Sequence, residues 1–158
     1  MENKEANKKN KVIYVDGSTN DTHSAICIVQ NNKKIIKTFE RGFNSYEIEL
    51  ICIVKAIETV EENSIIYSDR LDLVEELNQR KKNRDSIRFK YLFELIKEKN
   101  LKIEKISREK NLAGIALEKR LLTLKKENFL LRHPELRLTK EGRHKARKLG
   151  IENKYLKI

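Results

Sequence analysis

Apolar and polar positions change their spacing along the chain, and the spacing predicts a series of short elements. Three apolar runs near the N-terminus predict strands at 12–16, 23–30 and 35–42, with a polar turn at 31–34. From Ser45 the apolar positions fall three and four residues apart, which predicts a helix that lies on a sheet. Later runs predict a strand at 64–69, helices at 71–79 and 85–100, a strand at 101–107 and a helix at 111–131. Hairpin-linked strands followed by alternating helices and strands indicate an α/β fold with a mixed sheet.

Three acidic residues stand out against this pattern. Asp16 and Asp69 each end a predicted strand, and α/β sheets bind ligands at the carboxyl ends of their strands. Glu49 occupies the apolar stripe of its helix, where an ionised carboxylate is costly unless something compensates it. A single strand-end Asp is usually a turn residue, a helix cap or a solvated edge. Three acids gathered by the fold would instead predict a site for Mg²⁺ or Mn²⁺, whose charge offsets their repulsion.

Four segments resemble the type 1 ribonucleases H. The segments "YVDGS", "ELICIVKAIE" and "IIYSD" are similar to that family's first catalytic strand, its central helix and the strand that carries the third acid. The segment "ISREKNLAGIALEKRL" is similar to the closing segment, written R-E-x-N-x-x-A-D-x-L-A. The resemblance runs from about Lys11 to Leu122. It implies a ribonuclease H-like five-stranded mixed sheet, with three antiparallel strands and then parallel strands, flanked by helices.

The resemblance also implies a reaction. Members of the family hydrolyse the RNA strand of RNA–DNA hybrids with two metal ions. Carried over to this chain, Asp16 would bridge two Mg²⁺ or Mn²⁺ ions, and Glu49 and Asp69 would hold the second. The expected function is therefore a metal-dependent endonuclease, with these three acids as catalytic residues. The alternative is an inactive ribonuclease H-like subunit that binds nucleic acid or serves as a scaffold.

The fourth acid of the family is missing from this sequence. The matching position holds Gly114, which implies weak binding of the ion that activates water and reduced activity. Glu118 lies one turn further along the same helical face, and helical side chains lean toward the N-terminus. Glu118 is therefore a candidate metal ligand in place of the missing Asp. The other interpretation is an exposed Glu in a Lys-rich helix.

Nucleic-acid contacts are expected from residues around the acids and from the C-terminal segment. The candidates are Ser18, Tyr46, Arg70, Arg108, Asn111, Arg143, Arg147 and Lys148. Tyr46 and Arg70 stand where the family often has Asn and usually has Ser. The Arg70 guanidinium can meet a phosphate, or it can pair with Asp72 or Glu75 on the following turn.

The positive charge of the chain is concentrated near its C-terminus. Residues 119–158 hold 13 Lys and Arg against 4 Asp and Glu, whereas residues 1–118 hold 22 against 20, and the whole chain carries +11. A lysine-rich solvated surface is one explanation. A polyanionic partner fits the uneven distribution better, because each neutralised phosphate releases counterions.

The expected organisation is one domain with an appendage. We predict a disordered N-terminus at 1–10, a ribonuclease H-like domain at 11–124 and a basic helical extension at 125–158. The sequence contains neither an apolar run long enough to span a membrane nor a secretory signal, so a cytoplasmic location is expected. Cys27 and Cys52 have apolar neighbours, which is typical of buried free thiols.

Overall fold

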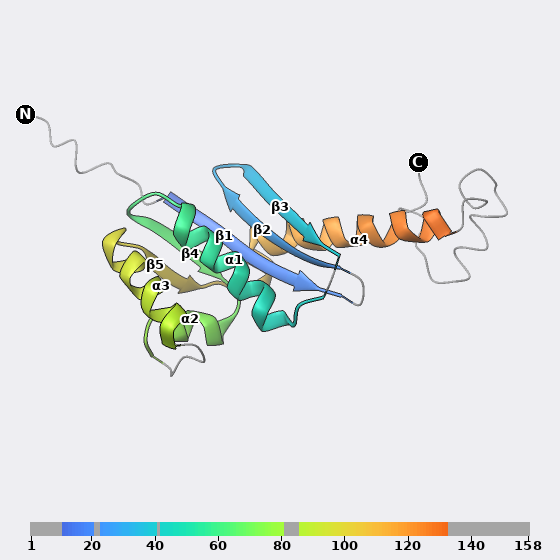
Figure 1. Ribbon diagram of the computed structural model, residues 1–158. Helices are drawn as coiled ribbons and strands as arrows, with labels where there is room; N and C mark the ends of the chain where they lie inside the picture. Colours follow the sequence, from blue (N-terminus) through green and yellow to red (C-terminus); the bar gives the residue numbers. More distant parts are fainter. Residues whose placement is uncertain (1–10, 21–22, 41, 81–85, 133–158) are drawn as a thin grey trace, which may run out of the picture. The chain divides into compact units, whose positions relative to one another are not determined.

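The computed structural model describes residues 11–20, 23–40, 42–80 and 86–132 (Figure 1). Its elements are β1 (Lys11–Thr19), β2 (Ser24–Gln30), β3 (Lys33–Phe39), α1 (Ser45–Thr59), β4 (Ser64–Ser68), α2 (Leu71–Leu77), α3 (Ser86–Glu98), β5 (Lys102–Lys105), the 3₁₀ helix η2 (Arg108–Lys110) and α4 (Leu112–Arg132). Among the described residues, no helix has the length and apolar character needed to cross a membrane.

The strands of the described residues form one mixed sheet in the order β3-β2-β1-β4-β5. β1 pairs antiparallel with β2, and β2 with β3, whereas β4 runs parallel to β1 and β5 parallel to β4. The predicted sheet is therefore confirmed in the number of its strands and in their directions, three antiparallel and then parallel.

Several boundaries differ. β1 continues to Thr19 because the residues after Asp16 keep their antiparallel pairing with β2, so Asp16 lies within the strand and does not end it as predicted. β3 begins at Lys33 because Asn31 and Asn32, both with positive φ, make a two-residue turn.

The core lies between the sheet and the first three helices. Inward side chains of the sheet, among them Ile13, Val15, Ile66 and Ile103, join one buried apolar cluster with residues of α1, α2 and α3. Figure 1 shows α1 running across the front of the sheet. Cys27 and Cys52 are free and buried as predicted, and burial raises the pKa of the Cys27 thiol to about 11.

α1 starts at a capping box, which fixes the register of the helix that carries Glu49. The Asn44 side chain accepts a hydrogen bond from the Glu47 amide at 2.8 Å, and the Glu47 carboxylate accepts one from the Asn44 amide at 3.4 Å. The predicted apolar stripe is buried, with Cys52, Ile53, Ala56 and Ile57 fully inaccessible. Glu49 lies beside this stripe and is half-buried.

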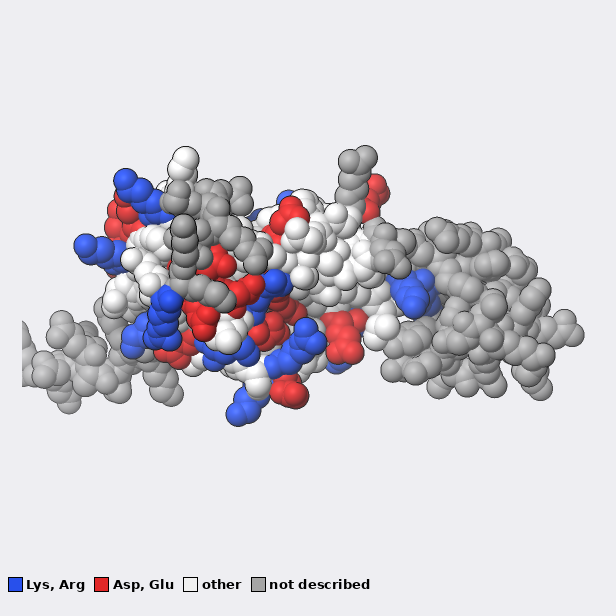
Figure 2. All heavy atoms as spheres, turned by 90° about the horizontal axis from the view of Figure 1, so that it is seen from below, with Lys and Arg blue, Asp and Glu red and all other residues white. Residues whose placement is uncertain are grey.

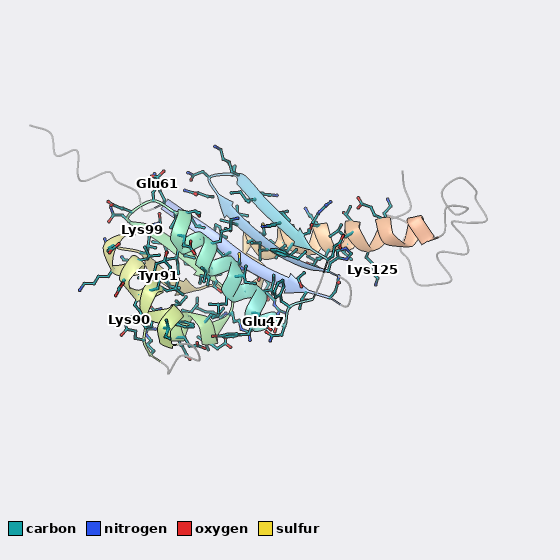
Figure 3. All side chains as sticks on the ribbon, viewed as in Figure 1. Glu47, Glu61, Lys90, Tyr91, Lys99 and Lys125 are labelled. Carbon is teal, nitrogen blue, oxygen red and sulfur yellow. The ribbon has the colours of Figure 1, made fainter. Side chains whose placement is uncertain are left out.

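The other end of α1 is closed by a lysine that directly follows α3. The Lys99 ammonium donates hydrogen bonds to the carbonyl oxygens of Ile57, Glu58 and Val60, at 2.8 to 3.1 Å. A cation at a helix C-terminus satisfies the last carbonyl groups and complements the helix dipole. Lys99 follows α3 (Figure 3), so this contact ties the ends of two helices together.

Contacts divide the chain into two units, Met1–Leu117 and Glu118–Ile158. The first contains the sheet, α1 to α3 and the start of α4. Of the second, the structure describes the continuation of α4 to Arg132. The predicted N-terminal segment at 1–10 and most of the predicted basic helical extension, residues 133–158, lie outside the described residues. The predicted domain boundary at 124/125 stays a prediction.

Candidate metal centre

The register of the parallel strands brings two acids together. Tyr14 of β1 pairs with Tyr67 of β4, and the rings of these residues stack with centroids 5.7 Å apart. Two residues further along each chain segment lie Asp16 and Asp69. Because side chains alternate along a strand, Asp16 lies on the same face of the sheet as Tyr14, and Asp69 directly follows the carboxyl end of β4.

Gly17 allows the third acid to approach the strands. A Cβ added to Gly17 would lie 2.7 Å from the carbonyl oxygen of Ile48 and 2.8 Å from the amide nitrogen of Glu49. Contacts this short with backbone atoms leave room for glycine alone. The backbone of α1 therefore rests directly on β1, next to Asp16.

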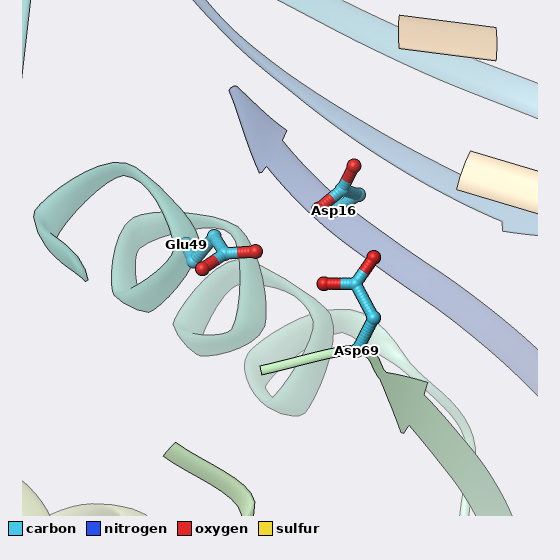
Figure 4. Close-up of side chains that lie close together, drawn as sticks. All are labelled: Asp16, Glu49 and Asp69. Carbon is cyan, nitrogen blue, oxygen red and sulfur yellow. The ribbon is translucent and has the colours of Figure 1, made fainter. Parts of the chain in front are cut away.

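The three acids form one cluster (Figure 4). One carboxylate oxygen from each of Asp16, Glu49 and Asp69 lies within 4.8 Å of the others, and all three residues are half-buried. Hard carboxylate oxygens at this separation fit a hard divalent cation such as Mg²⁺ or Mn²⁺. Among the described residues, this is the group of acids, histidines and cysteines that can hold such an ion.

The cluster is electrostatically strained without a counter-charge. Burial, with the neighbouring carboxylates of Asp69 and Glu49, raises the pKa of Asp16 from 3.8 to about 8. Burial also raises the pKa of Glu49, although hydrogen bonds from Asp16 and Arg70 act in the opposite direction. A divalent cation would favour the ionised forms of both carboxyl groups.

Arg70, which follows Asp69 in the chain, is bound within the protein. Its Nε and Nη2 atoms donate to the two carboxylate oxygens of Asp72 at 2.7 and 3.2 Å. Its Nη1 atom donates to Oε2 of Glu49 and to the Ser45 hydroxyl, each at 3.1 Å. Of the two predicted partners for this guanidinium, the pairing with Asp72 is confirmed, and a phosphate contact stays a prediction.

The Tyr46 ring packs against the Arg70 guanidinium. The Arg70 Cζ atom lies 5.3 Å from the centre of the Tyr46 ring, in the range of a cation–π contact. The Tyr46 hydroxyl donates a 2.8 Å hydrogen bond to the buried Glu76 carboxylate. The ring and the hydroxyl of Tyr46 thus both contact residues of the protein itself, Arg70 and Glu76. The predicted contact of Tyr46 with nucleic acid stays a prediction.

Asn111 connects the start of α4 to the cluster. It is fully buried, and its amide nitrogen donates to the Val15 carbonyl at 3.0 Å and to Oδ2 of Asp69 at 3.2 Å. Its side-chain oxygen accepts from the Ala113 amide at 3.2 Å, which caps the helix. The structure therefore gives Asn111 a role in orienting Asp69, whereas its predicted contact with nucleic acid stays a prediction.

Gly114 faces the cluster. A Cβ added to it would lie 3.0 Å from Oδ2 of Asp16, so this position presents its missing side chain to the first acid. Glu118 is exposed, and its predicted role as a replacement ligand stays a prediction.

The other predicted contact residues are spread over several segments. Ser18 is half-buried near the end of β1, and Arg108 is exposed on η2. The predicted contacts Arg143, Arg147 and Lys148 lie outside the described residues. Figure 2 shows basic side chains interspersed with acidic ones on the described part of one face.

Two contributors to the site were not predicted from the sequence. The bond from Arg70 to Ser45 and the bond from Tyr46 to Glu76 depend on how α1 packs beside α2. The capping role of Asn111 had a usable signal, because Asn directly before an apolar helical run is a favoured N-cap.

Comparisons with known proteins agree on the fold. No family model matches the chain, and no curated protein matches its sequence. Ribonuclease H1 from the halophilic archaeon Halobacterium salinarum NRC-1 is similar in structure, with a TM-score of 0.54 at 15% identity over 69% of this chain and 94% of that chain. LC11-RNase H1, isolated from compost by a metagenomic approach, has a TM-score of 0.52 at 18% identity over 68% and 91%.

A third similar structure is LC11-RNase H1 in complex with an RNA/DNA hybrid. Its TM-score is 0.51 at 16% identity, and the match covers 65% of this chain and 89% of that chain. The similarity includes most of each ribonuclease, and the strand order and directions found here agree with the resemblance of the sequence segments. The chain therefore has a ribonuclease H-like fold.

Proposed function

We propose that this protein is a metal-dependent endonuclease that cleaves the RNA strand of RNA–DNA hybrids. The observation that carries the proposal is the cluster of Asp16, Glu49 and Asp69 at the carboxyl end of a ribonuclease H-like sheet. Support for the substrate comes from a similar structure, LC11-RNase H1, which is a complex with an RNA/DNA hybrid.

The roles of the residues follow from their positions. Asp16, Glu49 and Asp69 would hold Mg²⁺ or Mn²⁺. The bound metal supplies an activated water and stabilises the charge of the leaving oxygen. Asn111 fixes Oδ2 of Asp69, which leaves Oδ1 of that carboxylate for other partners. Arg70 fixes Oε2 of Glu49 in the same way.

Gly114 favours reduced activity and also supports a second candidate function. Its position faces Asp16 but offers no carboxylate, so the described cluster has three acids. A protein with this site would bind its first ion weakly, or would have lost turnover and would serve as a nucleic-acid-binding or scaffold subunit. We favour the enzyme because all three acids remain and two of them, Asp69 and Glu49, are held by specific bonds from Asn111 and Arg70.

Cleavage of an end-labelled RNA–DNA hybrid tests the proposal. The parent chain is compared with Asp16→Asn and Gly114→Asp in Mg²⁺, in Mn²⁺ and in EDTA. We expect the parent to cut the RNA strand in at least one metal and Asp16→Asn to cut in neither. Cutting by Gly114→Asp alone would support the binding or scaffold function instead. Cutting that persists in Asp16→Asn or in EDTA would contradict a metal centre at this cluster.

A further inference from the structure

Arg70 places a permanent positive charge against the carboxylate cluster. An arginine does not lose its proton in a protein, so the charge is present at every working pH. The Nη1 edge of the guanidinium faces Glu49, and the Nε–Nη2 edge faces Asp72. Asp72 and Glu49 are thus bound at different edges of the guanidinium, and Arg70 contacts the cluster directly through Nη1.

The contacts of Arg70 fix this charge in place. Two bonds to Asp72, one to Ser45 and the Tyr46 ring at 5.3 Å hold the guanidinium independently of Glu49. The side chain of Arg70 is 24% exposed and that of Glu49 is 12% exposed, so solvent screens their interaction only in part. A guanidinium anchored in this way costs little further side-chain entropy when it bonds to Glu49.

A fixed cation at this place has two opposite effects. It offsets the repulsion among Asp16, Glu49 and Asp69, which stabilises the folded chain when no metal is bound. It also repels a divalent cation that binds the same three carboxylates, and it occupies Oε2 of Glu49. An ordinary packing residue would not produce this pair of effects, because its loss would weaken stability and metal binding together.

We propose that Arg70 is a built-in counter-ion of the carboxylate cluster, which stabilises the metal-free fold and lowers the affinity of the cluster for divalent cations. This inference rests on the proposed function, because it requires that the cluster bind metal. It makes Arg70 a positioning residue that acts through Glu49. Half-occupancy of the cluster would then require a higher metal concentration than the same three acids would require without Arg70.

Two measurements on the full chain test the proposal: Mn²⁺ binding, read from the electron paramagnetic resonance of free Mn²⁺, and thermal unfolding in EDTA. Arg70→Ser is expected to bind Mn²⁺ about threefold to tenfold more tightly than the parent, because a nearby positive charge is removed. Its unfolding temperature in EDTA is expected to fall. Arg70→Lys keeps the charge and should bind Mn²⁺ within about twofold of the parent.

Two further variants complete the design. Arg70→Gln removes the charge but keeps a hydrogen-bond donor, so it gives the same test if Arg70→Ser does not fold. Arg80→Ser removes an exposed arginine beyond α2 and should leave both measurements unchanged. Asp16→Asn shows whether the measured Mn²⁺ is bound at the cluster.

The outcomes separate the two proposals. Mn²⁺ binding that Asp16→Asn abolishes, combined with equal or weaker binding by the neutral Arg70 variants, overturns the counter-ion role and leaves the metal centre standing. Binding that Asp16→Asn leaves unchanged, or no binding by the parent and the Arg70 variants, overturns the metal centre and the counter-ion role together. Tighter binding with lower stability in EDTA supports both.

Discussion

Gly114 faces Asp16 so closely that a Cβ on the glycine would lie 3.0 Å from Oδ2 of the acid. The atom that it would meet is the end of a side chain, which can move by the few tenths of an ångström required. The position is therefore open to a larger residue, and the number of carboxylates at the cluster can be changed by one substitution.

We expect Gly114→Asp to strengthen metal binding. A fourth carboxylate should tighten Mn²⁺ binding about tenfold, because the affinity of oxygen sites rises with the number of charged ligands. In EDTA the same variant should unfold at a lower temperature than the parent, since it adds a charge beside Asp16. Gly114→Asn, similar in size but neutral, is the control. Equal Mn²⁺ affinities for the two variants would contradict the expected effect of charge.

The raised pKa of Asp16 predicts how stability depends on pH. Its folded-state pKa of about 8 lies above its ordinary 3.8, so the folded protein binds the proton more tightly than the unfolded chain does. The contribution to stability is fully present below about pH 4 and is lost as the pH rises toward about 8. Urea unfolding in EDTA should therefore show a free energy of unfolding that decreases from pH 5 to pH 8.

The same experiment has two internal controls. Asp16→Asn cannot ionise at this position, so its free energy of unfolding should decrease less over this pH range. Saturating Mn²⁺ should also flatten the dependence for the parent, because the ion stabilises the ionised carboxylates. A parent whose stability rises between pH 5 and pH 8 in EDTA would show that Asp16 titrates near its ordinary pKa.

Gly17→Ala should separate α1 from β1. The added methyl would lie 2.7 Å from the Ile48 carbonyl oxygen and 2.8 Å from the Glu49 amide nitrogen. Both are backbone atoms of α1, so the helix itself has to move. We expect a loss of about 1–3 kcal/mol in the free energy of unfolding, together with weaker Mn²⁺ binding, because Glu49 moves with the helix. Gly42→Ala is a matched control, since its Cβ would meet the nearest atoms at 3.6 Å, an ordinary contact.

Lys99→Met should destabilise the fold and leave the metal centre intact. The substitution keeps an unbranched side chain but removes the ammonium that bonds to three carbonyl groups at the end of α1. We expect a loss of about 1.5–3 kcal/mol by urea unfolding, with Mn²⁺ affinity unchanged. Lys90→Met, at an exposed position of α3 (Figure 3), should change stability by less than about 0.5 kcal/mol. Similar losses in both variants would mean that the bonds to the carbonyls contribute little.

Removal of residues 133–158 tests the contribution of the basic C-terminal segment. These residues carry 8 Lys and Arg against 3 Asp and Glu. If they contact phosphates, the shortened chain should bind a hybrid more weakly, and its binding should depend less steeply on salt concentration. An unchanged slope of log affinity against log salt would exclude phosphate contacts by this segment.

Much of the fold could be predicted from the sequence because it is encoded in local periodicity. The alternation around Ile13 and Val15 and the helical stripe around Cys52 and Ile53 report which faces are buried. The start of β3 was missed by two residues, since the turn depends on the positive φ of Asn31 and Asn32. Asparagine adopts that conformation more readily than most residues, so the signal was present but weak.

The site could be predicted in position but not in its internal bonds. Asp69 stands out because a carboxylate directly follows an apolar strand, and Asp16 and Glu49 because they interrupt an apolar strand and an apolar helical stripe. The choice of Arg70 between phosphate and protein partners depends on the placement of α2 beside α1, which no local pattern encodes. The burial of Asn111 was missed for a related reason, since asparagine is usually exposed.

The parallel pairing of β4 with β1 bears on how the protein folds. The chain passes through β2, β3 and α1 between Asp16 and Asp69. The cluster therefore depends on contacts between distant parts of the chain. Such contacts are slow to form, because the intervening loop must close first. An ion that binds only the completed cluster would leave the folding rate nearly unchanged and would act by slowing unfolding. Metal would thus lengthen the lifetime of the native protein more than it helps the chain to reach that state.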